Sequence, residues 1–167
     1  IDVVWNGMTI RDDLKTSMSI SDPYVVNAQV IVTKAENAEK YTDLESIKDA
    51  KIAVETGSAG EECVAECANV TAVAAQTDAL LEVKSGAADV CVIDITMAKA
   101  MTGEGTDYED LVVVDELAFA DEQYGIAFRK GADTCAAVND AMKALADNGK
   151  LAEIAEKYKL TEQILVK

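Results

Sequence analysis

Asp94 is the residue of this chain with the strongest case for a chemical role. It directly follows the run Val90–Ile93, which is continuously apolar, as in a parallel strand covered on both faces. In open α/β sheets, ligands bind beyond the carboxyl ends of such strands, and Asp94 would present a carboxylate there. The plainer alternative is that Asp94 only caps a helix that begins at Ile95, because Asp is a favoured N-cap residue.

A second candidate is the turn Thr56–Gly60, which precedes a helix bearing Cys63 and Cys67. Backbone N–H groups at the start of a helix can bind an anion. The turn has neither the GxGxxG pattern nor the lysine of a phosphate loop, so the sequence favours a carboxylate or another small anion over a nucleotide. The alternative is an ordinary strand-to-helix turn capped by Ser58.

Both candidates fall within a repeat of strands and helices. Strands at 51–55, 70–74 and 90–93 alternate with helical segments, which is the pattern of a doubly wound parallel sheet. Loops after neighbouring strands of such a sheet face one crevice, so the turn and Asp94 should lie side by side. An anion site beside a carboxylate suits the α-carboxylate and α-ammonium of an amino acid.

The other elements follow from apolar patterns and end signals. The helix before the Asp94 strand should begin with Thr77 as its N-cap and end at Ser85. Further elements are expected as a buried strand at Ile1–Trp5, a helix at 12–17, strands at 25–34, 111–114 and 123–129, and C-terminal helices broken at 148–149. The strands at 25–34 and 123–129 would cross between two lobes.

Composition limits the function classes. The 15 basic and 31 acidic residues give a net charge of −16, which disfavours nucleic acid and anionic membranes. The absence of His removes the commonest general base and a common metal ligand, which disfavours catalysis and a metal site without excluding an enzyme. We expect a protein that is not an enzyme and that binds no metal and no cofactor. No apolar run is long enough to span a bilayer.

The four cysteines form no CxxC pair. Cys63 and Cys67 are four residues apart, so a strained bridge is conceivable, but buried or free thiols are the favoured interpretation.

Six motifs stand in the order of a known family: NGMTI, SDPY, QVIVTK, GSAGEE, LEVKSGAADVCVID and YGIAFRKG. From end to end the chain resembles the family-3 solute-binding proteins, the amino-acid receptors of ABC importers. The resemblance implies an α/β, two-lobed, type II periplasmic-binding-protein fold with a two-strand hinge. Residues 35–118 would form a complete, doubly wound second lobe, and 1–34 with 119–167 a partial first lobe.

The resemblance also implies a function. The chain would be an extracytoplasmic binding component, in the periplasm or lipid-anchored as a lipoprotein, that traps a small polar ligand between lobes and passes it to a membrane permease. Two alternatives stay open: an enzyme on the same fold, resembling cyclohexadienyl or arogenate dehydratases, and a ligand-sensing receptor domain. The enzyme would need a second carboxylate beside Asp94, for which Glu55 and Glu61 are candidates.

Ligand contacts are implied at Gly7 and Thr9 in the first lobe, and at Ser58, Ala59 and Asp94 in the second, with Asp94 holding the ammonium. An arginine of the family's first-lobe motif grips the ligand carboxylate, and Leu14 stands in its place here. Arg11, three residues earlier, is a further candidate for that contact.

The family's first lobe begins with two βα units that have no counterpart in this chain. We therefore expect apolar surface on the first lobe, covered by a second copy of the chain or by the missing fragment.

Overall fold

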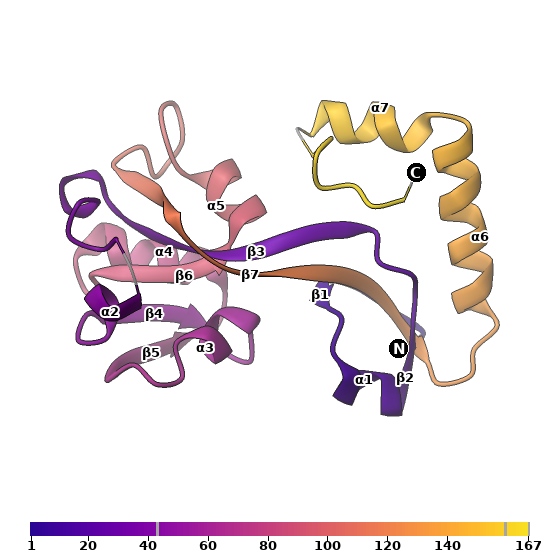
Figure 1. Ribbon diagram of the computed structural model, residues 1–167, viewed down its shortest axis with the longest axis horizontal. Helices are drawn as coiled ribbons and strands as arrows, with labels where there is room; N and C mark the ends of the chain where they lie inside the picture. Colours follow the sequence, from indigo (N-terminus) through magenta and orange to yellow (C-terminus); the bar gives the residue numbers. More distant parts are fainter. Residues whose placement is uncertain (43, 159, 167) are drawn as a thin grey trace. The chain divides into compact units, whose positions relative to one another are not determined.

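The chain folds into two units joined by two strands. The structure is a computed structural model that describes residues 1–42, 44–158 and 160–166, with the side chains at 115–118 left aside. Unit 1 comprises Ile1–Asn27 and Glu122–Lys167, and unit 2 comprises Ala28–Asp121. Both boundaries fall within strands, β3 (Val25–Lys34) and β7 (Leu111–Arg129) (Figure 1). That the units act as the two lobes of a binding protein stays a prediction.

Unit 2 is built on a sheet with the strand order β3-β6-β4-β5. Strands β4 (Lys51–Glu55), β5 (Asn69–Val73) and β6 (Val90–Asp94) run parallel, and β3 pairs antiparallel with β6. The helices of this unit are α2 (Leu44–Ile47), α3 (Ala59–Cys63), α4 (Gln76–Ser85) and α5 (Ile95–Met101), with a 3-10 turn, η1, at Ala35–Asn37. The predicted α/β class, with alternating parallel strands and helices, is confirmed.

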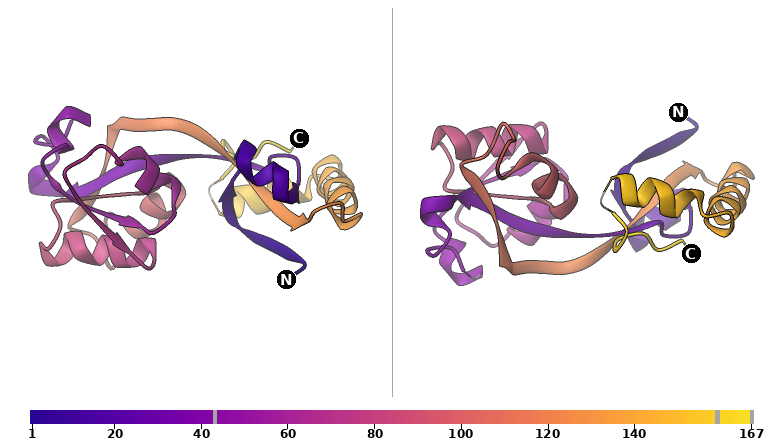
Figure 2. Two further views of the ribbon diagram at one scale, coloured as in Figure 1. Left: turned by 90° about the horizontal axis from the view of Figure 1, so that it is seen from below. Right: turned by 90° about the horizontal axis from the view of Figure 1, so that it is seen from above.

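The continuous apolar strands of unit 2 contribute side chains to two separate hydrophobic cores. On β6, Val90 and Val92 belong to one buried cluster, whereas Cys91 and Ile93 belong to the other. Successive side chains of a strand point to opposite faces, so each strand contributes to both cores. Figure 2 shows helices on both faces of this sheet. Burial on both faces explains why the sequence of β6 does not alternate between apolar and polar residues.

Unit 1 is arranged around the end of β7. Strands β1 (Val3–Thr9) and β2 (Met18–Ile20) both pair antiparallel with β7. The remaining elements are the helices α1 (Asp12–Ser17), α6 (Thr134–Asp147) and α7 (Lys150–Lys157). Near the C-terminus, Ile164 forms an isolated antiparallel bridge with Val25 at the start of β3. Within the described ranges, no helix has the length and apolar character to cross a bilayer.

Three expectations need correction. The first strand is not buried: Val3 is 47% and Trp5 56% exposed. Strand β1 is terminal in the sheet order, so it has no neighbouring strand on one side. Helix α4 begins at Gln76 with Ala75 at its N-cap, not Thr77, since the Ala75 carbonyl accepts from the N–H groups of the first turn. The two strands expected at 111–114 and 123–129 are one continuous strand, β7.

Candidate functional site

Asp94 lies at the carboxyl end of β6, as predicted from the sequence. Strand β6 is the parallel neighbour of β4, with Val54 paired to Val92. The turn after β4 and the residue that ends β6 therefore emerge at the same end of the sheet. The predicted proximity of Thr56–Gly60 to Asp94 follows from this register.

The side chain of Asp94 does not cap helix α5. Asp94 occupies the N-cap position of this helix, but its side chain makes no capping hydrogen bond. The carboxylate instead accepts from two amides: Gln29 Nε2 donates to Oδ1 at 2.6 Å, and Gln76 Nε2 donates to Oδ2 at 2.6 Å. The half-buried carboxylate is thus oriented by side chains from β3 and α4, which leaves the simple capping alternative without support.

The turn after β4 is a capped helix start. Ser58 is the N-cap of α3, and its Oγ accepts from the N–H of Glu61 at 3.1 Å. The carboxylate of Glu61 in turn accepts from the N–H of Gly57 at 2.6 Å. This reciprocal arrangement resembles a capping box. A negatively charged side chain of the chain itself therefore occupies part of the region expected to bind an anion.

Gly60 allows helix α3 to approach the sheet closely. A Cβ atom at this position would lie 2.8 Å from the Val92 carbonyl oxygen and 2.9 Å from Gln29 Oε1. Glycine is therefore required by packing rather than by an unusual backbone angle. The contact also shows that Gln29, 3% exposed, lies between α3 and Asp94.

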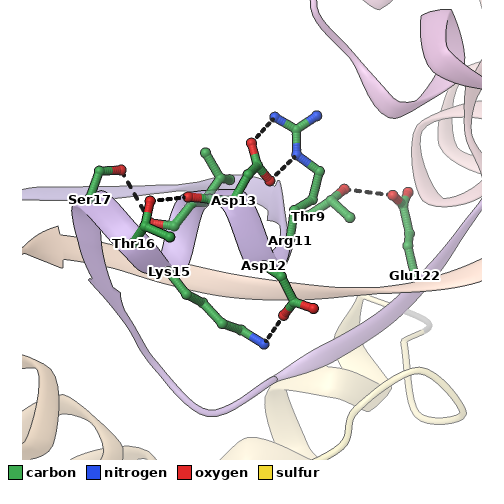
Figure 3. A network of polar contacts seen from close by, with 9 residues as sticks. Thr9, Arg11, Asp12, Asp13, Lys15, Thr16, Ser17 and Glu122 are labelled. Carbon is green, nitrogen blue, oxygen red and sulfur yellow. Dashed lines mark hydrogen bonds and ion pairs between the residues drawn. The ribbon is translucent and has the colours of Figure 1, made fainter.

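Of the two ligand contacts predicted in unit 1, Thr9 contacts a different acid, Glu122. Thr9 Oγ1 donates to Glu122 Oε2 at 2.5 Å (Figure 3), and Asn27 Nδ2 donates to Glu122 Oε1. Gly7 has a positive φ of 75°, and a Cβ atom there would lie 3.2 Å from the Tyr124 ring. Unit 1 thus brings Thr9 to a carboxylate, with Gly7 packed beside β7.

Arg11 is engaged within its own segment. Its guanidinium contacts the Asp13 carboxylate, with Nε 3.4 Å from Oδ1 and Nη2 3.5 Å from Oδ2 (Figure 3). Leu14 is half-buried on α1. Arg11 would have to leave Asp13 to reach a ligand carboxylate, so its role as a clamp stays a prediction.

The cysteines are free thiols in this structure. Burial raises the pKa of the Cys91 thiol, which is fully enclosed on β6. Burial also raises the pKa of Cys67, while the nearby Lys48 ammonium opposes the shift. Across the described residues, no group of three or more Cys, Asp or Glu side chains is arranged to hold a metal ion.

Sequence reasoning missed the acid Glu122 and three amides that donate to the two acids, Asn27, Gln29 and Gln76. A signal for two of them was present. Asn27 and Gln29 are amides within the apolar strand 25–34, and a buried amide needs a hydrogen-bond partner. Gln76 and Glu122 carried no comparable signal.

Comparison with known proteins identifies relatives of the chain. The family model for bacterial extracellular solute-binding proteins, family 3, matches residues 1–161. A probable histidine-binding protein of Neisseria gonorrhoeae is 32% identical over 94% of this chain and 60% of its own length. An arginine-binding extracellular protein of Bacillus subtilis (strain 168) is 29% identical over 95% of the chain and 63% of its own length. The chain thus spans about 60% of the curated relatives that it matches.

A similar architecture occurs among solved structures. The ancestral amino acid-binding protein AncCDT-1, described as a precursor of cyclohexadienyl dehydratase, is 32% identical with a TM-score of 0.84. The match covers 94% of this chain and 68% of that one. The chain is therefore similar to this protein in the arrangement of its helices and strands as well as in sequence.

Proposed function

Because the chain belongs to the bacterial extracellular solute-binding proteins, family 3, we propose that it binds an amino acid as the substrate-binding component of an ABC importer. Asp94 carries this proposal. Its carboxylate is half-buried, ends a parallel strand and is oriented by two amides instead of capping α5. A carboxylate held in this way suits the ammonium group of a ligand.

The proposed ligand contacts come from both units. Gly7 and Thr9 are proposed for unit 1, and Ser58, Ala59 and Asp94 for unit 2. The Ser58 hydroxyl already accepts the N–H of Glu61, so a contact from Ser58 would use its hydroxyl proton. The names of the two curated relatives supply histidine and arginine as the first ligands to test.

Two further relatives are named for the binding of L-cystine and of glutamine. Titration calorimetry of the chain with L-histidine, L-arginine, L-cystine and L-glutamine tests the proposal. We expect binding of at least one of them and its loss in Asp94→Ala, because the ammonium would lose its charged partner. Asp140→Ala, on the exposed side of α6, is the matched control. Unchanged binding in Asp94→Ala, or no binding of any of the four by the wild-type chain, would overturn the proposal.

A dehydratase-like enzyme is the second candidate, favoured by the similarity to a precursor of cyclohexadienyl dehydratase. General acid–base chemistry needs a second acid close to the reacting atoms. Of the acids considered, Glu61 accepts the N–H of Gly57, and the hydrogen bonds described for Asp94 come from amides. These contacts favour binding over catalysis. Release of phenylpyruvate from prephenate by the purified chain would reverse that preference.

The remaining parts of the proposal concern location and partners. An extracytoplasmic location, a lipid anchor and a membrane permease as recipient of the ligand are proposed from membership of the family. Unit 1 is proposed to be covered by a second copy of the chain or by a further polypeptide segment. The exposed apolar side chains of β1 support such a cover, namely Val3, Val4 and Trp5.

A further inference from the structure

We infer that Gln29 and Gln76 are positioning residues for Asp94: together they fix the orientation of its carboxylate, and they act on the ligand only through it. The inference rests on the proposed function, because it concerns the group that would receive the ligand ammonium. It adds two residues that are not among the predicted ligand contacts. Their contacts come from different elements, the connecting strand β3 and helix α4.

The orientation of the Gln76 amide is determined by the backbone of Asp94. The N–H of Asp94 donates to Gln76 Oε1 at 3.1 Å. A backbone N–H can only donate, so the oxygen of the amide must face it. The Nε2 group is then directed to Asp94 Oδ2, at 2.6 Å. Gln76 therefore presents a donor to this oxygen.

Gln29 fixes the other carboxylate oxygen from the opposite strand. Gln29 and Asp94 are directly paired in the antiparallel register of β3 and β6. The Gln29 side chain is enclosed, since its Oε1 would be 2.9 Å from a Cβ atom at Gly60 and the residue is 3% exposed. Its Nε2 donates to Asp94 Oδ1 at 2.6 Å. A packed side chain holds this hydrogen bond in one geometry.

One donor on each oxygen fixes the carboxylate plane. Rotation of the Asp94 carboxylate about its last side-chain bond would break the bond to Gln29, the bond to Gln76, or both. Hydrogen bonds to charged groups are stronger than those between neutral groups. The two amides thus present the carboxylate to a ligand in one preset orientation, which lowers the cost of ordering it on binding.

The first test needs no ligand. In the full chain labelled with ¹⁵N, the side-chain amide resonances of Gln29 and Gln76 should shift in Asp94→Ala, whereas the exposed Gln123 should be unaffected. Unmoved resonances of Gln29 and Gln76 would show that the contacts are absent in solution and would overturn the inference.

The second test separates positioning from general damage. Gln29→Met and Gln76→Met keep the side-chain length but remove the donor, and we expect each to weaken L-arginine binding about tenfold. The affinity for argininic acid, which has a hydroxyl in place of the α-ammonium, should fall much less. The reason is that the amides act through Asp94, the proposed partner of the ammonium. Gln123→Met is the control that should leave both affinities unchanged. If the wild-type chain binds L-histidine more tightly than L-arginine, L-histidine and imidazole-lactic acid replace L-arginine and argininic acid in this test.

The outcomes distinguish the two levels of the proposal. Equal losses for the amino acid and its hydroxy analogue would indicate structural damage and would overturn the positioning role. If the wild-type chain binds no amino acid, the proposed function fails, and with it the role of the amides toward a ligand. The amide resonances would in that case still decide whether the arrangement around Asp94 exists.

Discussion

The Thr9 hydroxyl donates to the Glu122 carboxylate at 2.5 Å, which joins two residues that are 113 positions apart in the sequence. Asn27, 1% exposed, donates to the other oxygen of the same carboxylate. One acid therefore ties together β1, the start of β3 and the end of β7 within unit 1.

Removal of this acid should destabilise the chain. In Glu122→Ala, Thr9 and the buried Asn27 lose their hydrogen bonds to the carboxylate, and we expect a loss of about 1–3 kcal/mol in the free energy of unfolding. Urea denaturation followed by circular dichroism measures it. Glu104→Ala, an exposed position in unit 2, should change the value by less than about 0.5 kcal/mol. Equal effects of both substitutions would contradict the prediction.

Gly60→Ala should destabilise unit 2 by about 1–3 kcal/mol, the usual cost of overpacking. The added methyl group would lie 2.8 Å from the Val92 carbonyl oxygen and 2.9 Å from Gln29 Oε1. Part of the cost should disappear when the substitution is made in a Gln29→Ala background, while the backbone contact should remain. Additive free energies of unfolding in this double-mutant cycle would show that residues 29 and 60 are not coupled.

Cys91 should be the least reactive thiol of the folded chain. Burial raises its pKa, so the reactive thiolate is scarce at pH 8. Titration with Ellman's reagent should label Cys91 only after unfolding. Labelling of Cys91 at the rate of a free thiol in the native chain would contradict the burial of β6.

The same burial predicts a dependence of stability on alkaline pH. The folded state keeps the Cys91 proton, whereas the unfolded chain releases it above about pH 8.5. The unfolded state then binds fewer protons, so stability present at lower pH is lost as the pH rises. Relative to Cys91→Ala, the wild-type chain should lose about 1.4 kcal/mol more per pH unit above that value. Parallel pH profiles of the two proteins would contradict this prediction.

The exposed first strand should promote self-association when no other segment covers it. Val3 and Trp5, 47% and 56% exposed, lie on the same face of β1 because they are two residues apart. We expect Val3→Lys/Trp5→Lys to shift sedimentation velocity profiles toward the monomer. Leu81→Lys is a matched control, since Leu81 is an apolar residue of similar exposure on α4 of unit 2. A wild-type chain that sediments as a single monomeric species would contradict the prediction that the exposed β1 promotes self-association.

The core of unit 2 could be predicted well from the sequence, because local pattern and burial agree there. The run Val90–Ile93 is apolar throughout, and both of its faces meet helices. The strand Val25–Lys34 was likewise predicted with the bounds that the structure has. In contrast, the apolar run at Ile1–Trp5 predicted burial, but burial depends on what lies beside a strand, and β1 is at the edge of the sheet.

The candidate site was predictable only in part. Asp94 and the turn at Ser58 carry local signals, a carboxylate after a buried strand and a helix cap. Gln29 carries the signal of an amide within an apolar strand, but no local signal pairs Gln29 or Gln76 with Asp94. The two amides are 65 and 18 residues away and reach Asp94 only through the pairing of strands and the packing of α4. Long-range polar contacts of this kind follow from the tertiary arrangement.

The division of the chain also has a consequence for the order of folding. Unit 2 is one continuous segment, Ala28–Asp121, and contains both of the large buried clusters. Unit 1 is assembled from the two ends of the chain, so its contacts, such as the strand pair β1–β7, must close a loop of roughly a hundred residues. During synthesis, unit 2 can begin to fold before the last segment has left the ribosome. Strand β1 of unit 1 can pair with β7 only after β7 has been synthesised, so this pairing forms later than the contacts of unit 2 that are close in sequence.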